Sequence, residues 1–319
     1  MRVFWIIPAI AALSSALLSS AQDVYTRTEV DVNGKRVALG PTEVVTKDGR
    51  TELSRSVNGQ LVPVEKTEER VLQEDANGKT VERLIKRYDS TGVALPPIKE
   101  VISQQKTAGG GSVTTRTVYA GDVNGHMEVQ ERTLTQTRKA GDSENSETVV
   151  QRPTINGGLE PVSRQVVEKV KSGDSYQENS TTYRPDPNGA LVPSTKVSKS
   201  VIKTNGQTTE NAAEYEIGST GQMSLHSQTV QSTVKRADGS EDTQLQVFRQ
   251  SVPGIAASSD GKLHLIEQQR IERKKTSGDT VVETVEVQRP TLADPNRLGP
   301  PKQLSETICK GKCEKPDQP

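Results

Sequence analysis

A turn motif that recurs about every 32 residues constrains this chain more than any other feature of its sequence. Three copies share the pattern Asn-Gly-x-Leu-x-Pro, and they begin at Asn58, Asn156 and Asn188. Looser copies keep the glycine, so that successive turn glycines are 33, 33, 32, 32, 32 and 40 residues apart. Such a period is typical of repeat architectures. The turn glycines are Gly59, Gly92, Gly125, Gly157, Gly189, Gly221 and Gly261.

A second turn lies about midway between successive copies of the motif, as at Asp48-Gly49 and Asn205-Gly206. Asn-Gly and Asp-Gly favour the positive φ angles of a two-residue type I′ hairpin. The segments between turns, such as 112–119 and 280–287, are rich in Val and Thr, which favour strands. The sequence therefore predicts an all-β fold, an antiparallel β-meander in which each repeat of ~32 residues is one hairpin.

The strands are too polar to build a thick core. Hydrophobic residues make up 31% of the chain, the mean hydropathy is −0.64, and 41 basic residues balance 41 acidic ones. We therefore expect an extended or loosely curled, largely single-layer sheet that is stabilised by contacts between neighbouring hairpins. Pro63, Pro97, Pro161 and Pro193 follow the turns closely, and we interpret them as marking strand starts after loops of more than two residues.

Three segments are expected along the chain. Residues 1–21 have the basic, apolar and small-residue regions of a secretory signal peptide, with cleavage after Ala21. Residues 22–304 form the hairpin array of about eight units, with an enlarged loop at 251–258. The tail at 305–319 contains Cys309 and Cys313, which in an exported protein predict a disulfide, free thiols being the alternative.

Two membrane arrangements are disfavoured by the sequence. After signal removal no second apolar segment is long enough to span a bilayer. An outer-membrane barrel needs a lipid-facing apolar band with aromatic girdles, whereas the segment after residue 21 has one Phe, six Tyr, no Trp and strands that are polar on both faces. A barrel of that kind is therefore not expected.

An aromatic residue recurs six residues before the turn glycine in three copies, Gln151 has that place in a fourth, and Tyr88 and Phe248 have the matching place in looser copies. One aromatic side chain per hairpin at one phase predicts a stripe on one face of the sheet, which either packs against neighbouring strands or binds a ligand by stacking. The residues of this stripe are Tyr88, Tyr119, Tyr183, Tyr215 and Phe248.

Catalytic and metal-binding chemistry is not indicated. His126, His226 and His264 lie at different phases of the repeat, so they are expected to be solvated. The Asp-x-Asn-Gly copies, such as the one beginning at Asp186, lack the carboxylate that ends a calcium loop, and an Asx-type turn explains them. No nucleic-acid partner is expected from a chain of balanced charge. The sequence predicts no enzyme, cofactor or metal.

The sequence thus favours an exported, non-enzymatic β-repeat protein with a structural or adhesive role at the cell envelope. The alternative is a module that binds an extracellular polymer, such as a polysaccharide, through the aromatic stripe. A hydrolase with its site in the loop at 251–258 is a third hypothesis. The expected location is secreted, periplasmic or at the cell surface, with an extracellular polymer or an envelope component as partner.

Overall fold

The computed structural model describes residues 22–32, 35–47, 49–57, 60–89, 91–121, 126–218, 220–250, 262–276, 280–291 and 297–310. The regular elements in these ranges are β-strands, which confirms the predicted all-β class. These ranges contain no helix of the length and hydropathy needed to cross a membrane. The predicted signal peptide, Gly59, Gly125, Gly261, the loop at 251–258 and Cys313 lie outside the described residues.

The described strands follow one another in a single sheet. Their bounds are β1 (Gln22–Val32), β2 (Lys35–Lys47), β3 (Arg50–Val57), β4 (Gln60–Glu74), β5 (Gly78–Arg87), β6 (Ile98–Lys106), β7 (Ser112–Gly121), β8 (Met127–Ala140), β9 (Ser143–Pro153), β10 (Leu159–Ser172), β11 (Ser175–Pro185), β12 (Leu191–Thr204), β13 (Gln207–Ile217), β14 (Met223–Lys235), β15 (Glu241–Arg249), β16 (His264–Lys275), β17 (Thr280–Gln288) and β18 (Lys302–Lys310).

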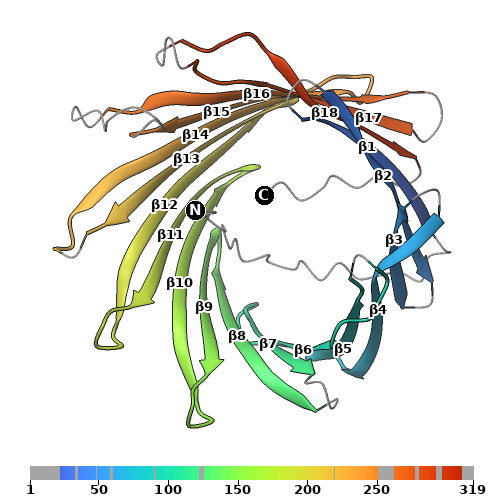
Figure 1. Cartoon of the computed structure of the whole chain (residues 1–319). Coiled ribbons are helices and arrows are strands. Elements are labelled where there is room, and N and C mark those ends of the chain that lie inside the picture. The colour runs from blue at the N-terminus through green and yellow to red at the C-terminus, as the bar shows by residue number, and fades with distance from the viewer. Residues whose placement is uncertain are drawn as a thin grey trace.

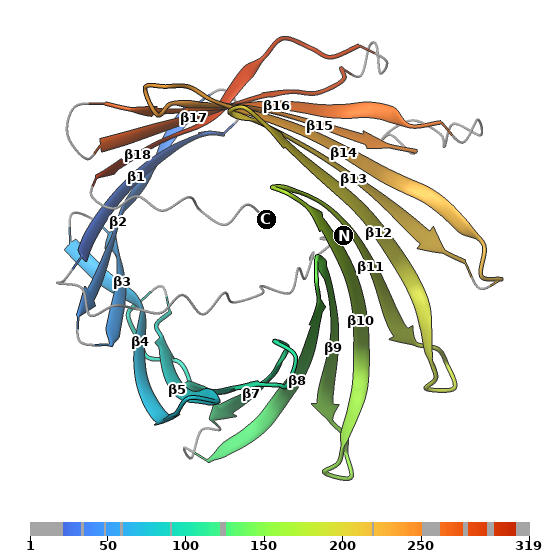
Figure 2. The same cartoon turned by 180° about the vertical axis from the view of Figure 1, so that it is seen from behind.

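The sheet closes on itself. Each strand pairs antiparallel with the next, as the predicted meander requires, and β1 also pairs with β18, with Thr28 opposite Thr307. The result is an 18-stranded ring of strands (Figures 1 and 2). The sheet is one layer, as expected, but it is a barrel. From the sequence a barrel was not expected, and that prediction of the shape was therefore wrong.

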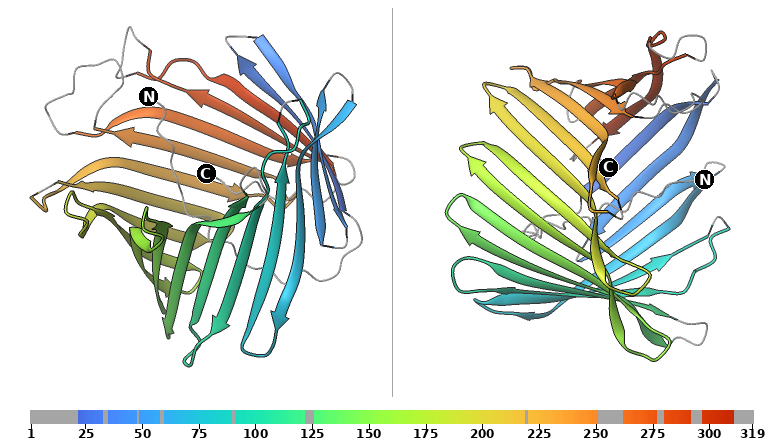
Figure 3. Two further views of the ribbon diagram at one scale, coloured as in Figure 1. Left: turned by 60° about the horizontal axis from the view of Figure 1, so that its bottom comes forward. Right: turned by 90° about the vertical axis from the view of Figure 1, so that its left-hand side faces the viewer.

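The hairpin turns follow the predicted chemistry at both ends of the barrel (Figure 3). Asn205 and Gly206 have φ angles of 33° and 83°, as a type I′ turn requires. The loop that begins at Asp186 is wider: Asp186 N–H donates to the Ala190 carbonyl at 2.8 Å, and Gly189 N–H donates to the Asp186 carbonyl at 2.9 Å. Gly189 has a φ of 84°, so this loop is a type I turn followed by a glycine bulge.

A β-bulge recurs at one phase of the repeat, close to these wider loops. Pro63, Pro161 and Pro193 lie inside β4, β10 and β12, each next to a bulged residue, whereas Pro97 directly precedes β6. The strand-start interpretation therefore holds only for Pro97. Bulges bend a sheet and increase its twist, which helps it to close. The bulged residues are Val64, Gln130, Val162, Ser194, His226, Ile266 and Leu304.

Candidate functional site: the charged inner wall

Side-chain crowding identifies the inner face of the barrel. Residues opposite one another in the register share a face, and side chains on the concave face converge. Val81 and Val201, which are 3% and 4% exposed, lie on one face, as do most of the buried side chains. Val170 and Ile202, which are 53% and 54% exposed, lie on the other. We therefore assign the face of Val81 and Val201 to the inner wall.

The inner wall has little hydrophobic core. Its buried hydrophobic residues are few, and no described side chain falls below 2% exposure. Polar contacts fill much of the space between strands instead: Thr135 Oγ1 lies 3.0 Å from Thr148 Oγ1, and Gln165 Nε2 donates to Ser180 Oγ at 2.9 Å. The wall is consequently a polar surface rather than the inside of a packed domain.

A row of alternating charges crosses the inner wall from β8 to β12. We call it the Lys/Glu row, and its members lie directly opposite one another in successive strand pairs. Their order around the barrel is Lys139, Glu144, Lys169, Glu178 and Lys199.

Ion pairs hold the Lys/Glu row in place. Lys139 Nζ lies 3.3 Å from Glu144 Oε2, and Lys169 Nζ lies 3.5 Å from Glu178 Oε2. The row continues to β13 because Lys199 Nζ lies 2.6 Å from Glu210 Oε1. The ammonium group of Lys169 also lies 3.9 Å from the centroid of the Tyr176 ring, within the range of a cation–π contact.

A second charged group, the Arg/Glu cluster, lies on the inner wall of β4 to β7. It consists of Glu69, Arg83, Glu100 and Arg116. The Glu100 side chain is only 8% exposed and contacts both arginines: Arg116 donates a hydrogen bond to it, and Arg83 Nη1 lies 3.7 Å away. Arg83 Nη2 also lies 2.9 Å from Glu69 Oε2. Each of the four charges in this cluster therefore has a partner of opposite sign.

Neither the Lys/Glu row nor the Arg/Glu cluster was predicted, although the sequence contains a pattern that indicates the Lys/Glu row. The pairs of the Lys/Glu row are symmetric about the two-residue turns: Lys139 and Glu144 flank Gly141-Asp142, and Lys169 and Glu178 flank Gly173-Asp174. Folding the sequence back at each turn glycine would have placed them opposite one another. The Arg/Glu cluster joins strands across longer connections, and turn symmetry alone does not reveal it.

The predicted aromatic stripe lies on the outer wall, near the end of the barrel with the wider loops. Lys99 Nζ lies 4.6 Å from the ring centroid of Tyr119, and the Arg164 guanidinium lies 5.1 Å from that of Tyr183. A cation therefore covers one face of each of these two rings. Phe248 lies opposite Leu265 in the register. Tyr88 forms an isolated bridge with Ala94, and Tyr215 lies opposite Lys196 and Leu225.

The remaining predicted sites are structural or untested. Asp186 Oδ1 accepts hydrogen bonds from the backbone N–H groups of Asn188 and Ala190, at 2.8 and 2.9 Å, which confirms the Asx-type turn. His226 Nδ1 lies 3.6 Å from Glu216 Oε1. Over the described ranges, no three His, Cys, Asp or Glu side chains gather in a group that could hold a metal ion. Of the two cysteines of the predicted disulfide only Cys309, in β18, is described, so the disulfide stays a prediction.

Comparison with known proteins places this barrel among solved structures. No family model matches the chain, and no curated protein matches it in sequence. A triple mutant of the porin from Rh. blastica aligns with 92% of this chain and 99% of its own, with a TM-score of 0.52 and 6% identity. Salmonella typhi OmpF in complex with daunomycin aligns with 91% of this chain and 96% of its own, with a TM-score of 0.50 and 9% identity. The chain has a porin-type barrel fold.

This fold corrects the function expected from the sequence. A structural or adhesive role was inferred from an open array of hairpins, and polymer binding from an accessible aromatic stripe. The sheet is closed instead, a cation covers a face of Tyr119 and of Tyr183, and two solved structures of similar fold are porins. Neither expectation is retained.

Proposed function

We propose that this chain is a channel of the bacterial cell envelope, in which small polar and charged solutes pass along the inner wall of the barrel. The observation that carries the proposal is the closed 18-stranded sheet with the Lys/Glu row and the Arg/Glu cluster on its inner face. Barrels of 16 to 18 strands are wide enough for an aqueous channel, whereas eight-stranded barrels are filled by side chains. The porin fold supports the same function by analogy.

The envelope location rests on two independent features. Residues 1–21 have the pattern of a secretory signal peptide, and the fold resembles that of bacterial porins. The sequence also predicted an envelope protein at this coarse level. The alternative that the protein is secreted is no longer proposed. Transport through such a barrel needs no catalytic residue, cofactor or bound metal.

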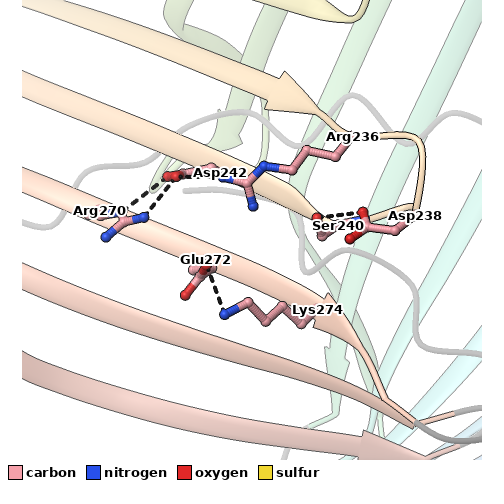
Figure 4. Close-up of polar contacts among 7 residues, drawn as sticks. All are labelled: Arg236, Asp238, Ser240, Asp242, Arg270, Glu272 and Lys274. Carbon is pink, nitrogen blue, oxygen red and sulfur yellow. Dashed lines mark hydrogen bonds and ion pairs between the residues drawn. The ribbon is translucent and has the colours of Figure 1, made fainter.

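The outer wall limits how lipid can surround the channel. Arg164 Nε lies 2.6 Å from Glu147 Oε1 on this wall, and Arg270 Nη2 lies 2.9 Å from Asp242 Oδ2 (Figure 4). An Arg or Lys that faces lipid at the bilayer midplane costs about 2–4 kcal/mol. We therefore place the charged strands of the outer wall against water or other envelope proteins rather than against lipid.

Single-channel recording tests the proposal. The purified chain, added to a planar lipid bilayer that separates two KCl concentrations, should give stepwise conductance. Replacing two inner-wall cations, Lys169→Gln with Lys199→Gln, should shift the reversal potential toward cation selectivity, because charged groups that line a pore attract the counterion.

The matched control removes two cations from the outer wall, Arg164→Gln with Lys196→Gln. This variant should keep the reversal potential of the parent chain, since its changed side chains face away from the solute path. A folded chain that gives no conductance steps contradicts the proposed function. So does a reversal potential that responds equally to inner-wall and outer-wall substitutions.

A further inference from the structure

Charge is distributed unevenly around the outer wall. The outward positions of β11 to β15 are every second residue within 177–183, 196–202, 209–215, 228–234 and 242–248, and we call them the uncharged sector. Of these 20 positions only two are charged, Lys196 near one end of the barrel and Asp242 near the other.

The strands on either side of this sector are different. The outward positions of β10 include Arg164 and Glu168, and those of β16 include Arg270, Glu272 and Lys274. Charged residues make up 26% of the whole chain, so five adjacent strands with two outward charges depart from its general composition. The sector ends where the charged strands begin.

The side chains of the sector form three bands along the barrel. Tyr183, Tyr215 and Phe248 lie toward the end with the wider loops. Amides and hydroxyls fill the middle, and Asn211 lies near its centre, opposite Ser200 and Val230. Toward the other end Ile202 and Val234 are 54% and 41% exposed, which is more than water favours for aliphatic side chains. Gln177, Thr209 and Asp242 share this end.

We propose that the uncharged sector is the contact surface for a second copy of this chain. Amides and hydroxyls both donate and accept hydrogen bonds, so two identical amide-rich surfaces can satisfy one another without like-charge repulsion. A two-fold axis parallel to the barrels sets each band against the same band of the other copy, aromatic against aromatic and aliphatic against aliphatic.

The size of the sector sets the upper limit of such a contact. Five strands at ~4.8 Å spacing and about eight residues at ~3.3 Å rise cover ~600 Å² on each copy. Because both barrel walls are convex, two copies would bury at most about 1,200 Å² in total, which is the lower end of the range for stable protein interfaces. A lipid surface is a poorer occupant of the same sector, because buried amides and hydroxyls without partners are costly in hydrocarbon.

Charge placed at the centre of the sector tests the proposal. Asn211→Lys with Gln246→Lys puts two cations in one register row, two strands apart, and about the two-fold axis the cation on the central strand β13 would face the same cation of the second copy. By sedimentation equilibrium the parent chain should show twice the monomer mass, and this variant should dimerise at least about tenfold more weakly. The matched control is Gln105→Lys with Gln136→Lys, which has the same spacing on β6 and β8, outside the uncharged sector.

Cross-linking gives a second measurement that does not depend on the effect of added charge. Asn211→Cys should be joined between copies by a short bis-maleimide, and Gln136→Cys should not. A parent chain that sediments as a monomer at all concentrations overturns the proposal, as does an Asn211→Lys, Gln246→Lys variant that remains dimeric. A monomer that floats with phosphatidylcholine vesicles, when the charged variant does not, assigns the sector to lipid instead. None of these results depends on whether the barrel conducts.

Discussion

At the scale of single residues, charges in this barrel are stabilised mainly by neighbouring charges. Glu100 shows this most clearly, since its carboxylate is removed from water and lies between Arg83 and Arg116. Burial of a carboxylate costs several kcal/mol unless opposite charges and hydrogen bonds compensate. No motif marks Glu100 in the sequence, because its partners lie 16 and 17 residues away on different strands.

Removal of both arginines should expose this dependence. Arg83→Met with Arg116→Met leaves the Glu100 carboxylate buried without these cations and should lower the free energy of unfolding by about 3 kcal/mol. Adding Glu100→Met to the same chain should restore most of the loss, because no buried charge then remains. Urea denaturation followed by far-UV circular dichroism measures both effects. Equal stability of the double and triple variants would show that the arginines act through packing alone.

At the scale of elements, the sequence predicted the turns well and the bulges poorly. Asn-Gly and Asp-Gly pairs carry a local conformational preference, so Asn205-Gly206 and the Asp186 loop could be placed from the sequence alone. A bulge is defined by two strands together, and one of them is distant in sequence. Pro161 and Pro193 were the residues that could have indicated the bulges, because proline has no backbone N–H to donate to a neighbouring strand.

Three turn aspartates should make the barrel sensitive to acid. Hydrogen bonds lower the pKa of each from its ordinary value of 3.8: Asn77 and Gly78 N–H donate to Asp75, the Thr91 hydroxyl and Val93 N–H donate to Asp89, and the Ser240 hydroxyl and N–H donate to Asp238. A carboxylate with a lowered folded-state pKa stabilises the fold above its unfolded pKa. That contribution is lost as the pH falls through the folded pKa, below about pH 4.

Substitution of all three aspartates by asparagine should reduce this sensitivity, because an amide keeps the acceptor oxygen and does not titrate over this range. Between about pH 5 and about pH 2, the range in which such carboxylates titrate, the thermal midpoint of the variant should fall less than that of the parent chain. Asp142→Asn serves as the control for removal of one exposed charge. An identical fall in the triple variant and the parent chain would assign the acid sensitivity to other carboxylates.

At the scale of the whole molecule, closure could not be predicted from the sequence. Each hairpin is specified by its own turn, whereas closure depends on the pairing of β1 with β18, which lie at opposite ends of the array. Polar residues on both strand faces also prevented the prediction of a barrel, because a barrel is recognised in a sequence by an apolar outer band. The solved porins share the fold at 6% and 9% identity, so architecture here is set by strand number, register and bulges rather than by particular residues.

Closure can be tested by a cross-link between the first and last strands. Thr28 and Thr307 are direct partners in the β1–β18 register, and direct partners in an antiparallel pair have Cα atoms about 4.5–5.5 Å apart, within the reach of a disulfide. Thr28→Cys with Thr307→Cys should therefore yield a linked peptide pair by mass spectrometry after mild oxidation of the folded chain. Thr28→Cys with Glu283→Cys is the control, since Glu283 lies opposite Thr307 on β17, on the same wall and one strand further from β1. Two strand spacings come to about 9.6 Å, beyond disulfide reach, so equal linkage in both variants would mean that β1 and β18 meet only transiently.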